Sequence, residues 1–250
     1  TIVKYSPNLV VVNNLEPDHL DFYKNHKAVY NRINQLEQYT LCMTNSPGVY
    51  LSCKNLYPET KYLKFALGFH PLEASLKDKD FSDFLLLSNN ANYIGEVGLD
   101  FSRSSAISQD KQLRYFESIV KMCAQKNKLL SVHLRKSEND AIQIIGKYQP
   151  RKCIIHWFNG TKEQLNELVD LGCFFSINSN MIKTKVSCDK LKNIPIDCIL
   201  IESDGPFTKL GSQNFIPEIL IDTYQAISNT ISAPNLVELV YGNFKKILTM

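Results

Sequence analysis

Five short apolar segments of this chain each end on a histidine or a carboxylate, and stretches of helical pattern separate them. The segments are residues 66–70, 93–96, 129–133, 153–156 and 198–204. Continuous runs of Val, Ile and Leu are typical of buried parallel strands, and the side chains that follow such strands gather at one edge of the sheet. We therefore expect metal-binding side chains from distant parts of the chain to meet at one site.

The order of apolar and helical patterns predicts eight strands that alternate with helices. The strands are expected at 8–13, 39–43, 63–69, 92–96, 129–133, 153–156, 173–177 and 198–201, with turn residues at 44–48. Helices are expected at 19–37, 81–88, 108–127, 137–147, 161–171, 183–191, 214–231 and 234–248. With a length of 250 residues, this order predicts an α/β fold: one TIM-like (β/α)8 barrel that forms a single domain over 1–250. The first strand lacks the glycine-rich turn of a Rossmann fold.

The composition excludes several classes of protein. A net charge of +3 permits a polyanionic ligand but is far below that of a dedicated non-specific DNA binder. The seven cysteines show no Cys-x-x-Cys spacing, which predicts reduced core thiols in a cytoplasmic protein. No apolar run is long enough to span a bilayer, so no membrane partner is expected.

Histidines and carboxylates share the same position at the ends of the predicted strands. A single histidine there is more often a hydrogen-bonded core residue than a ligand, but three of the five histidines occupy such positions. The set consists of His70, His133, His156, Glu96 and Asp204. A mixture of imidazoles and carboxylates suits Mg, Mn or Zn, singly or as a pair. Glu202 is expected to support these ligands rather than to bind metal itself.

The strand ends and their flanking residues resemble the TatD family of metal-dependent deoxyribonucleases, within the amidohydrolase-like barrels. The matching strings, in family order from about residue 65, are Gly-Phe-His-Pro at 68–71, Ile-Gly-Glu-Val-Gly-Leu-Asp-Phe at 94–101, Val-His-Leu-Arg at 132–135, His-Trp-Phe-Asn-Gly at 156–160, Leu-Ile-Glu-Ser-Asp-Gly-Pro at 200–206 and Gly-Asn-Phe at 242–244. The Gly-Glu-x-Gly-Leu-Asp and Glu-Ser-Asp-x-Pro strings are highly specific.

The resemblance implies a role for each ligand. Glu96 would bridge two divalent metals, His133 and His156 would complete the site of one ion, and Asp204 would hold the other. Glu96 and Asp204 are therefore the predicted catalytic residues, and Asp204 could also orient the attacking water. The family places a histidine at the position of His70 as a substrate or phosphate contact rather than as a metal ligand.

Further residues near the strand ends are predicted to bind substrate. Arg103 and Arg135 are placed to hold phosphates, Asp100 lies in the same loop region, and Trp157 with Phe158 could stack an unpaired base. The alternative is that Arg135 pairs with a nearby carboxylate and that Trp157 packs against the rim of the barrel. Both interpretations stay open at the level of sequence.

The chain departs from the family at the end of the first strand. Many members carry His-x-His there, whereas this chain has Pro17 where the first imidazole should be and His19 at the second position. Asn13 or Glu16 could substitute with oxygen ligands. A hydrated oxygen-ligand site favours Mg or Mn over Zn, and two ions are still expected.

Three functions are compatible with these residues. The first is a Mg- or Mn-dependent deoxyribonuclease that acts as an exonuclease on single-stranded DNA. The second is a metal-dependent ester or amide hydrolase, such as a D-aminoacyl-tRNA deacylase-like enzyme, because the barrel hosts many chemistries. The third is a degenerate TatD-like subunit of a multi-protein antiviral assembly. The intact ligand set favours the enzymes over the third function.

Overall fold

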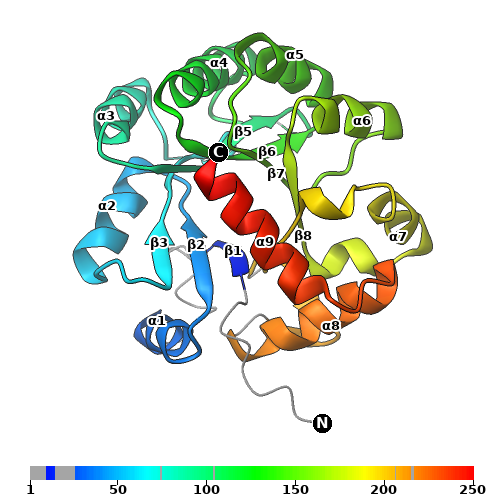
Figure 1. Ribbon diagram of the computed structural model, residues 1–250. Coiled ribbons are helices and arrows are strands. Elements are labelled where there is room, and N and C mark those ends of the chain that lie inside the picture. Colours follow the sequence, from blue (N-terminus) through cyan, green and yellow to red (C-terminus); the bar gives the residue numbers. More distant parts are fainter. Residues whose placement is uncertain (1–9, 15–25, 74, 104, 206, 215–216) are drawn as a thin grey trace.

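Parallel strands form the wall of a barrel, and helices surround this wall (Figure 1). The computed structural model describes residues 10–14, 26–73, 75–103, 105–205, 207–214 and 217–250. The strands of the wall are β1 (Val10–Asn14), β2 (Tyr39–Met43), β3 (Leu63–Phe65), β4 (Leu67–Phe69), β5 (Tyr93–Asp100), β6 (Leu129–Arg135), β7 (Cys153–His156), β8 (Phe174–Ile177) and β9 (Ile199–Ile201).

Hydrogen-bonded ladders join these strands in chain order. One sheet runs β1-β2-β3 and the other runs β4-β5-β6-β7-β8-β9, with every pair parallel. Strands β1 and β9 contact each other, which brings the first and last strands of the wall together. All residues of β7 to β9 are buried except His156 at the mouth, which explains why these strands read as continuous apolar runs.

The helices follow the strands around the outside of the barrel. They are α1 (His26–Gln35), α2 (Pro47–Leu56), α3 (Asp78–Ser88), α4 (Gln109–Lys126), α5 (Glu138–Tyr148), α6 (Lys162–Asp170), α7 (Lys185–Leu191), α8 (Leu220–Ile231) and α9 (Leu236–Thr249). Short 3-10 turns occupy Ser179–Ile182, Ile196–Cys198 and Pro217–Ile219, and β10 (Lys209–Leu210) pairs with β11 (Gln213–Asn214) in a small hairpin.

Helix α9 lies across the amino-terminal end of the barrel, as Figure 1 shows in red. The Nδ2 atom of Asn243 donates to the backbone oxygens of Ile196 and Ile199 at 2.9 and 2.8 Å. The Lys152 ammonium donates to the backbone oxygen of Leu248 at 2.9 Å, just before β7 begins. These bonds explain the Gly-Asn-Phe string at 242–244 as a structural motif that ties α9 to the strand starts. The opposite, carboxyl-terminal end of the barrel carries the predicted site.

The predicted strand at 63–69 is two strands, β3 and β4, which belong to different sheets. The break falls at Ala66, whose backbone oxygen accepts from the hydroxyl of Thr44 at 2.8 Å, and the same hydroxyl accepts from the backbone N–H of Gly68 at 3.0 Å. The backbone of Thr44 bonds instead to Gly95 and Glu96 of β5. The side chain of Thr44 therefore occupies the backbone groups that a continuous ladder would need.

The sequence missed helix α2 because the Ser-Pro-Gly stretch resembles a turn. In the structure Ser46 is the N-cap, its hydroxyl accepts from the backbone N–H of Val49 at 3.3 Å, and Pro47 opens the first turn. Proline is favoured at this first helical position because its missing N–H would have no partner there. Elsewhere the predicted elements lie close to the observed ones, with three exceptions. Residues 8–9 and 15–25 are outside the described residues, β5 continues to Asp100, four residues past its expected end, and α8 starts six residues later than expected.

Candidate metal centre

The carboxyl-terminal ends of the strands surround a cavity of about 580 Å³. Its wall consists of residues within β5 and β6 and of residues that end or follow β2, β4, β5, β6, β7 and β9. The wall includes each residue that the sequence predicted for the site: His70, Glu96, Asp100, Arg103, His133, Arg135, His156, Trp157 and Asp204. It also includes Asn45, Glu73 and Phe207, which sequence reasoning did not single out.

Glu96 is the point on which the imidazoles converge. Its Oε1 atom lies 3.0 Å from Nδ1 of His133, 3.5 Å from Nε2 of His70 and 3.6 Å from Nε2 of His156. The side chain is nearly buried, and burial raises the pKa of Glu96, but the charges of His156 and His70 and the hydrogen bond from His133 outweigh burial. The pKa of Glu96 is therefore held well below its usual value, so this carboxyl stays anionic.

His156 presents one nitrogen to the cavity and uses the other for support. Its Nδ1 atom lies 2.6 Å from Oε2 of Glu202, and because a carboxylate only accepts, Nδ1 carries the proton. The Nε2 atom lies 3.6 Å from Glu96 and 3.7 Å from Oδ1 of Asp204. Burial lowers the pKa of His156, but the charges of Glu202, Glu96 and Asp204 raise it well above its usual value, so Nε2 would have to lose its proton to bind a metal. Glu202 is fully buried and accepts a second bond from Asn178 at 2.8 Å. A carboxylate behind a ligating histidine is a common arrangement in metal sites.

His133 lies between two carboxylates in the same way. Its partner in the strand register is His156, so the two imidazoles project side by side from β6 and β7. The Nδ1 atom of His133 faces Glu96, and its Nε2 atom lies 2.9 Å from Oδ2 of Asp100. Burial lowers the pKa of His133, but the hydrogen bonds with Asp100 and Glu96 raise it more. Asp100 is thus held by His133 and also lines the cavity, and the substrate contact expected for Asp100 stays a prediction.

The ring of His70 is oriented as a hydrogen-bond donor. The backbone N–H of Leu72 donates to Nδ1 of His70 at 3.2 Å, so Nε2 is the ring nitrogen that carries a proton. That N–H points toward Glu96, with 3.5 Å between Nε2 and Oε1. His70, Glu96 and His133 bring their ligand atoms within 4.8 Å of one another. The hydrogen bond from Leu72 occupies Nδ1, and the phosphate contact expected for His70 stays a prediction.

Asp204 reaches the cavity through an unusual backbone conformation. Its φ angle is 44°, in the left-handed region, and Trp157 after β7 has a φ of 40°. Such conformations are uncommon for residues other than glycine and cluster at functional sites. Burial raises the pKa of Asp204 to about 7, with the charge of His156 acting in the opposite direction.

The donor set fits a divalent cation. Glu96, Asp100, Glu202 and Asp204 are all nearly or fully buried around one cavity, and buried carboxylates need positive charge nearby. The ligands predicted from the sequence, Glu96, His133, His156 and Asp204, have imidazole nitrogens and carboxylate oxygens 3.0 to 3.7 Å apart. This combination suits Mg, Mn or Zn.

The segment that departs from the family's His-x-His motif lies where the structure describes no side chains. Glu16, Pro17 and His19 lie outside the described residues, and of Asn13 in β1 only the backbone is described. The oxygen ligands expected from Asn13 or Glu16 therefore stay a prediction.

Removal of the charge behind His156 is expected to weaken metal binding. In Glu202→Gln the Nδ1 proton of His156 loses its anionic partner. The ring is then held less firmly, and its Nε2 atom becomes a weaker metal ligand. We expect the dissociation constant for Mn²⁺, measured by isothermal titration calorimetry, to rise by roughly 10- to 100-fold. The control is Glu117→Gln, which removes a carboxylate paired with Lys147 on the outer surface. Equal Mn²⁺ affinity of the two variants would contradict this role.

The rim of the cavity carries cationic and aromatic side chains. Arg103 and Arg135 are exposed, and in the described part of the chain neither guanidinium has a carboxylate at ion-pair distance. Trp157 is half-buried, with its ring edge-on to His156 at 6.3 Å, and Phe207 is 57% exposed. Phe158, which was expected to stack a base together with Trp157, is buried against Phe175 and is not among the residues that line this cavity.

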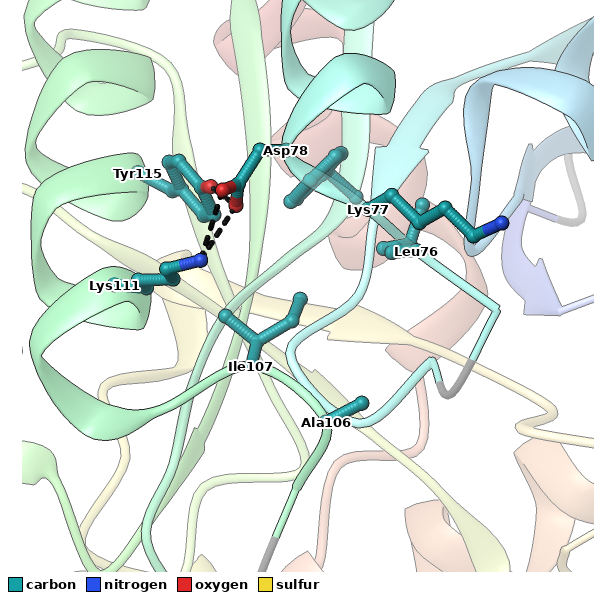
Figure 2. A pocket seen from close by; sticks show the side chains of 8 residues that line it. Leu76, Lys77, Asp78, Ala106, Ile107, Lys111 and Tyr115 are labelled. Carbon is teal, nitrogen blue, oxygen red and sulfur yellow. Dashed lines mark hydrogen bonds and ion pairs between the residues drawn. The ribbon is translucent and has the colours of Figure 1, made fainter.

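A second, smaller cavity lies outside the barrel between α3 and α4, and Figure 2 shows its lining. Its volume is about 150 Å³. The carboxylate of Asp78 at its edge accepts from Lys111 at 2.8 and 2.9 Å and from Tyr115 at 2.6 Å, and the bond from Lys111 is the main cause that lowers its pKa. This carboxylate is already paired, and no imidazole is nearby among the lining residues. The metal-binding chemistry therefore belongs to the larger cavity.

Comparison of the sequence with models of protein families identifies the family of this chain. The family model described as TatD related DNase matches residues 16–249. This chain belongs to the TatD-related DNase family. The resemblance predicted from the motifs is confirmed, and the match begins well before residue 65, where the recognisable strings start. The expectation of a metal-dependent hydrolase that acts on ester bonds is confirmed with it.

Individual relatives and solved structures agree with this assignment. A Vairimorpha ceranae protein, named as a TATDN1 homologue, is 32% identical over 193 residues, which cover 71% of each chain. YcfH of Escherichia coli K12, described as an uncharacterized metal-dependent hydrolase, is 25% identical over 249 residues, or 92% of each chain. The crystal structure of the TatD homologue YjjV from Escherichia coli K12 matches with a TM-score of 0.82 at 16% identity, over 97% of this chain and 98% of that chain. The last likeness confirms the TIM-like barrel.

Proposed function

We propose that this protein is a Mg²⁺- or Mn²⁺-dependent deoxyribonuclease that hydrolyses phosphodiester bonds at the ends of single-stranded DNA. The observation that carries the proposal is the convergence of His133 and His156 on Oε1 of Glu96, with Asp204 3.7 Å from His156. The description of the family as DNases and the name of the YcfH relative as a metal-dependent hydrolase support it.

The ligands in this proposal are Glu96, His133, His156 and Asp204. A pair of bound divalent cations would supply Lewis-acid stabilisation of the charge that develops on the attacking and leaving oxygens. Glu96 contributes the anionic centre, and Asp204 is placed to orient the attacking water and to accept its proton. Asp100 and Glu202 hold the imidazoles in position from behind.

Cationic groups on the wall would bind the phosphate. His70 offers an N–H donor toward the centre, and Arg103 and Arg135 are exposed donors on the same wall. Charge-assisted bonds from guanidinium groups to phosphate oxygens are short and directional. Because the family's strand-one histidines are missing, oxygen ligands would dominate the second ion site, which favours Mg or Mn over Zn.

Aromatic side chains at the mouth support a single-stranded substrate. Trp157 follows His156 and Phe207 follows Asp204, so the two rings flank the proposed metal ligands. Bases stack on aromatic rings without regard to sequence once they are unpaired. A chain end with an unpaired terminal base is therefore the form of DNA that this mouth would accept.

The cellular setting is also a proposal. All seven cysteines are free, and in the described part of the structure no helix has the length and apolar character needed to cross a membrane. We infer a cytoplasmic location from the thiols, with residues 1–250 as one TatD-like unit.

The test of the proposed function is cleavage of end-labelled single-stranded DNA after removal of metal with EDTA and re-addition of Mg²⁺, Mn²⁺ or Zn²⁺. We expect no cleavage without metal and a ladder of shortened products with Mg²⁺ or Mn²⁺. Labelled RNA and misacylated tRNA run beside the DNA. Preferential release of the amino acid from misacylated tRNA would replace the nuclease by an ester hydrolase, and no cleavage with any metal would support a non-catalytic subunit.

A further inference from the structure

Positive charge is concentrated in two segments that the proposed metal centre does not use. Residues 178–192 and 207–214 together contain five lysines and one aspartate, whereas the whole chain of 250 residues has a net charge of only +3. The rest of the chain is therefore close to neutral. A local excess of cations on a protein of nearly balanced charge is typical of a surface that meets a polyanion.

Hydrogen bonds join the two segments into one unit at the edge of the cavity. The side chain of Asn180 donates to the backbone oxygen of Phe207 at 3.5 Å. The hydroxyl of Ser179 donates to the backbone oxygen of Lys209 at 3.1 Å. The backbone N–H of Lys183 donates in turn to the backbone oxygen of Asn180 at 3.3 Å. Because Phe207 lines the cavity, this unit begins at the mouth and continues outside it.

Three of the five lysines lie at the mouth end of this unit. Strand β8 runs parallel to the strands that carry the metal ligands, so the turn after it lies at the mouth, and α7 leads back from there toward the start of β9. Lys183 follows the turn, Lys185 opens α7, and Lys209 is two residues past Phe207. All three side chains are exposed. We call Lys183, Lys185 and Lys209 the lysine shelf.

The ammonium groups of the lysine shelf are available to a ligand. The lysines that form ion pairs in the described part of the chain are Lys111, Lys147 and Lys246, which lie outside the two segments. The one aspartate of the segments, Asp189, takes part in none of these ion pairs. Helix α8 also contacts the turn and carries one exposed carboxylate in its first turn, Asp222. The lysine shelf therefore keeps a net positive charge.

The exposed side chains change from aromatic at the cavity to cationic outside it. Phe207 is exposed, Thr208 is buried and Lys209 is exposed again, so Phe207 and Lys209 leave the same side of the segment. A single nucleic acid strand offers the matching order, because an unpaired base stacks on an aromatic ring and the phosphates that follow bind cations whatever the sequence. Lysine suits such phosphates because its ammonium is a compact point charge on a flexible stem.

We propose that the lysine shelf binds the phosphates of the part of a single-stranded DNA that stays outside the cavity. The strand leaves the mouth past Phe207 and runs over the turn after β8 to the start of α7. The inference rests on the proposed nuclease function and adds to it the path of the substrate. An oligonucleotide that only fills the cavity does not reach the lysine shelf, so the contribution of these lysines must depend on strand length.

Binding of oligonucleotides of two lengths tests this path. In a Glu96→Gln background, which prevents turnover, fluorescence anisotropy gives the dissociation constants of single strands of about 4 and about 15 nucleotides. The shelf variant combines Lys183→Gln, Lys185→Gln and Lys209→Gln. Each phosphate contact of a single strand adds about 0.7 to the slope of log affinity against log salt concentration. We expect this slope to fall by about 2 for the longer strand, and its affinity to fall about 10- to 100-fold near 0.1 M salt. The affinity for the shorter strand should change less than about twofold.

A second triple variant separates local contacts from the loss of overall charge. Lys54→Gln, Lys121→Gln and Lys192→Gln remove the same charge from exposed positions in the second halves of α2 and α4 and just after α7, away from the mouth. We expect this control to keep the salt slope and the affinity for both strands. Arginine at the three shelf positions keeps the charge and should retain the affinity for the longer strand. All substituted side chains are exposed, so the melting temperatures should stay equal.

Three outcomes would overturn the inference. They are equal losses of affinity in the shelf variant and the control, a loss that is the same for both strand lengths, and an unchanged affinity of the shelf variant for the longer strand. The last result is the one expected if the lysine shelf meets an acidic protein instead of DNA. Where the wild-type protein still cleaves DNA with metal, each of these results removes this inference alone. Absence of both cleavage and binding would remove the proposed function as well.

Discussion

Glu96→Gln is expected to cleave single-stranded DNA about a thousandfold more slowly than the wild-type protein at saturating Mn²⁺. Glutamine keeps the shape of the side chain but removes the negative charge on which three imidazoles converge, with Oε1 of Glu96 3.0 to 3.6 Å from their nitrogens. Loss of an anionic ligand from a metal centre removes several kcal/mol of transition-state stabilisation, and about 4 kcal/mol corresponds to a thousandfold. Initial rates on end-labelled DNA give the ratio directly.

The fold of this variant should survive, because glutamine fills the same space as glutamate. The melting temperature and far-UV circular dichroism of Glu96→Gln therefore serve as the second readout. Glu117→Gln removes a surface carboxylate on α4 and should retain the wild-type rate. If Glu96→Gln keeps more than a tenth of the wild-type rate while Glu117→Gln is unchanged, Glu96 is not the anionic centre of the reaction.

Gly98→Ala is expected to lower the free energy of unfolding by about 3 kcal/mol or more. The φ angle of Gly98 is +152°, and a Cβ atom there would lie 2.0 Å from the backbone oxygen of His133. The strained backbone costs about 1 to 3 kcal/mol. The steric overlap, which only a shift of β6 can relieve, adds a further cost. Because β6 carries His133, metal affinity should fall together with stability. Urea unfolding followed by the fluorescence of the single tryptophan measures the stability.

Two other glycines separate conformational strain from steric overlap. Gly172 has a φ of +78°, and a Cβ atom added there would have nothing within 4 Å, so Gly172→Ala should cost about 1 to 2 kcal/mol from conformation alone. Gly242 lies inside α9 with open space around it, and Gly242→Ala should be stabilising by about 0.5 to 1 kcal/mol. A Gly98→Ala protein no less stable than Gly172→Ala would show that β6 does not resist the added methyl group.

The barrel was predictable because its strands are buried on both faces. Segment 153–156 was expected as a strand and is β7, and its residues before His156 are fully buried. Where local interactions compete with the strand pattern, prediction was less exact. The break at Ala66 depends on the hydroxyl of Thr44, which lies 22 residues away in sequence. Helix α2 was predictable in principle from Ser46 at the cap and Pro47 after it.

That the predicted histidines, carboxylates and arginines line one cavity could be expected, because parallel strands all deliver their carboxyl ends to one opening. Asn45, Glu73 and Phe207 of the same wall were not singled out, because no motif marks them. Individual contacts, such as the 2.9 Å between His133 and Asp100 or the packing of Phe158 in the core, depend on the tertiary structure.

The sequence alone determined the fold class, the family and which imidazoles and carboxylates reach the mouth, because strand periodicity and chain order are local properties. The contacts that each of these groups makes depend on the tertiary structure. Glu202 sets the tautomer of His156 from 46 residues away, and Glu73 orients the amide of Asn45 from 28 residues away. A hydrogen bond of this kind is lost when its two atoms move apart by a few tenths of an ångström. The packing of the whole barrel sets the distance between them.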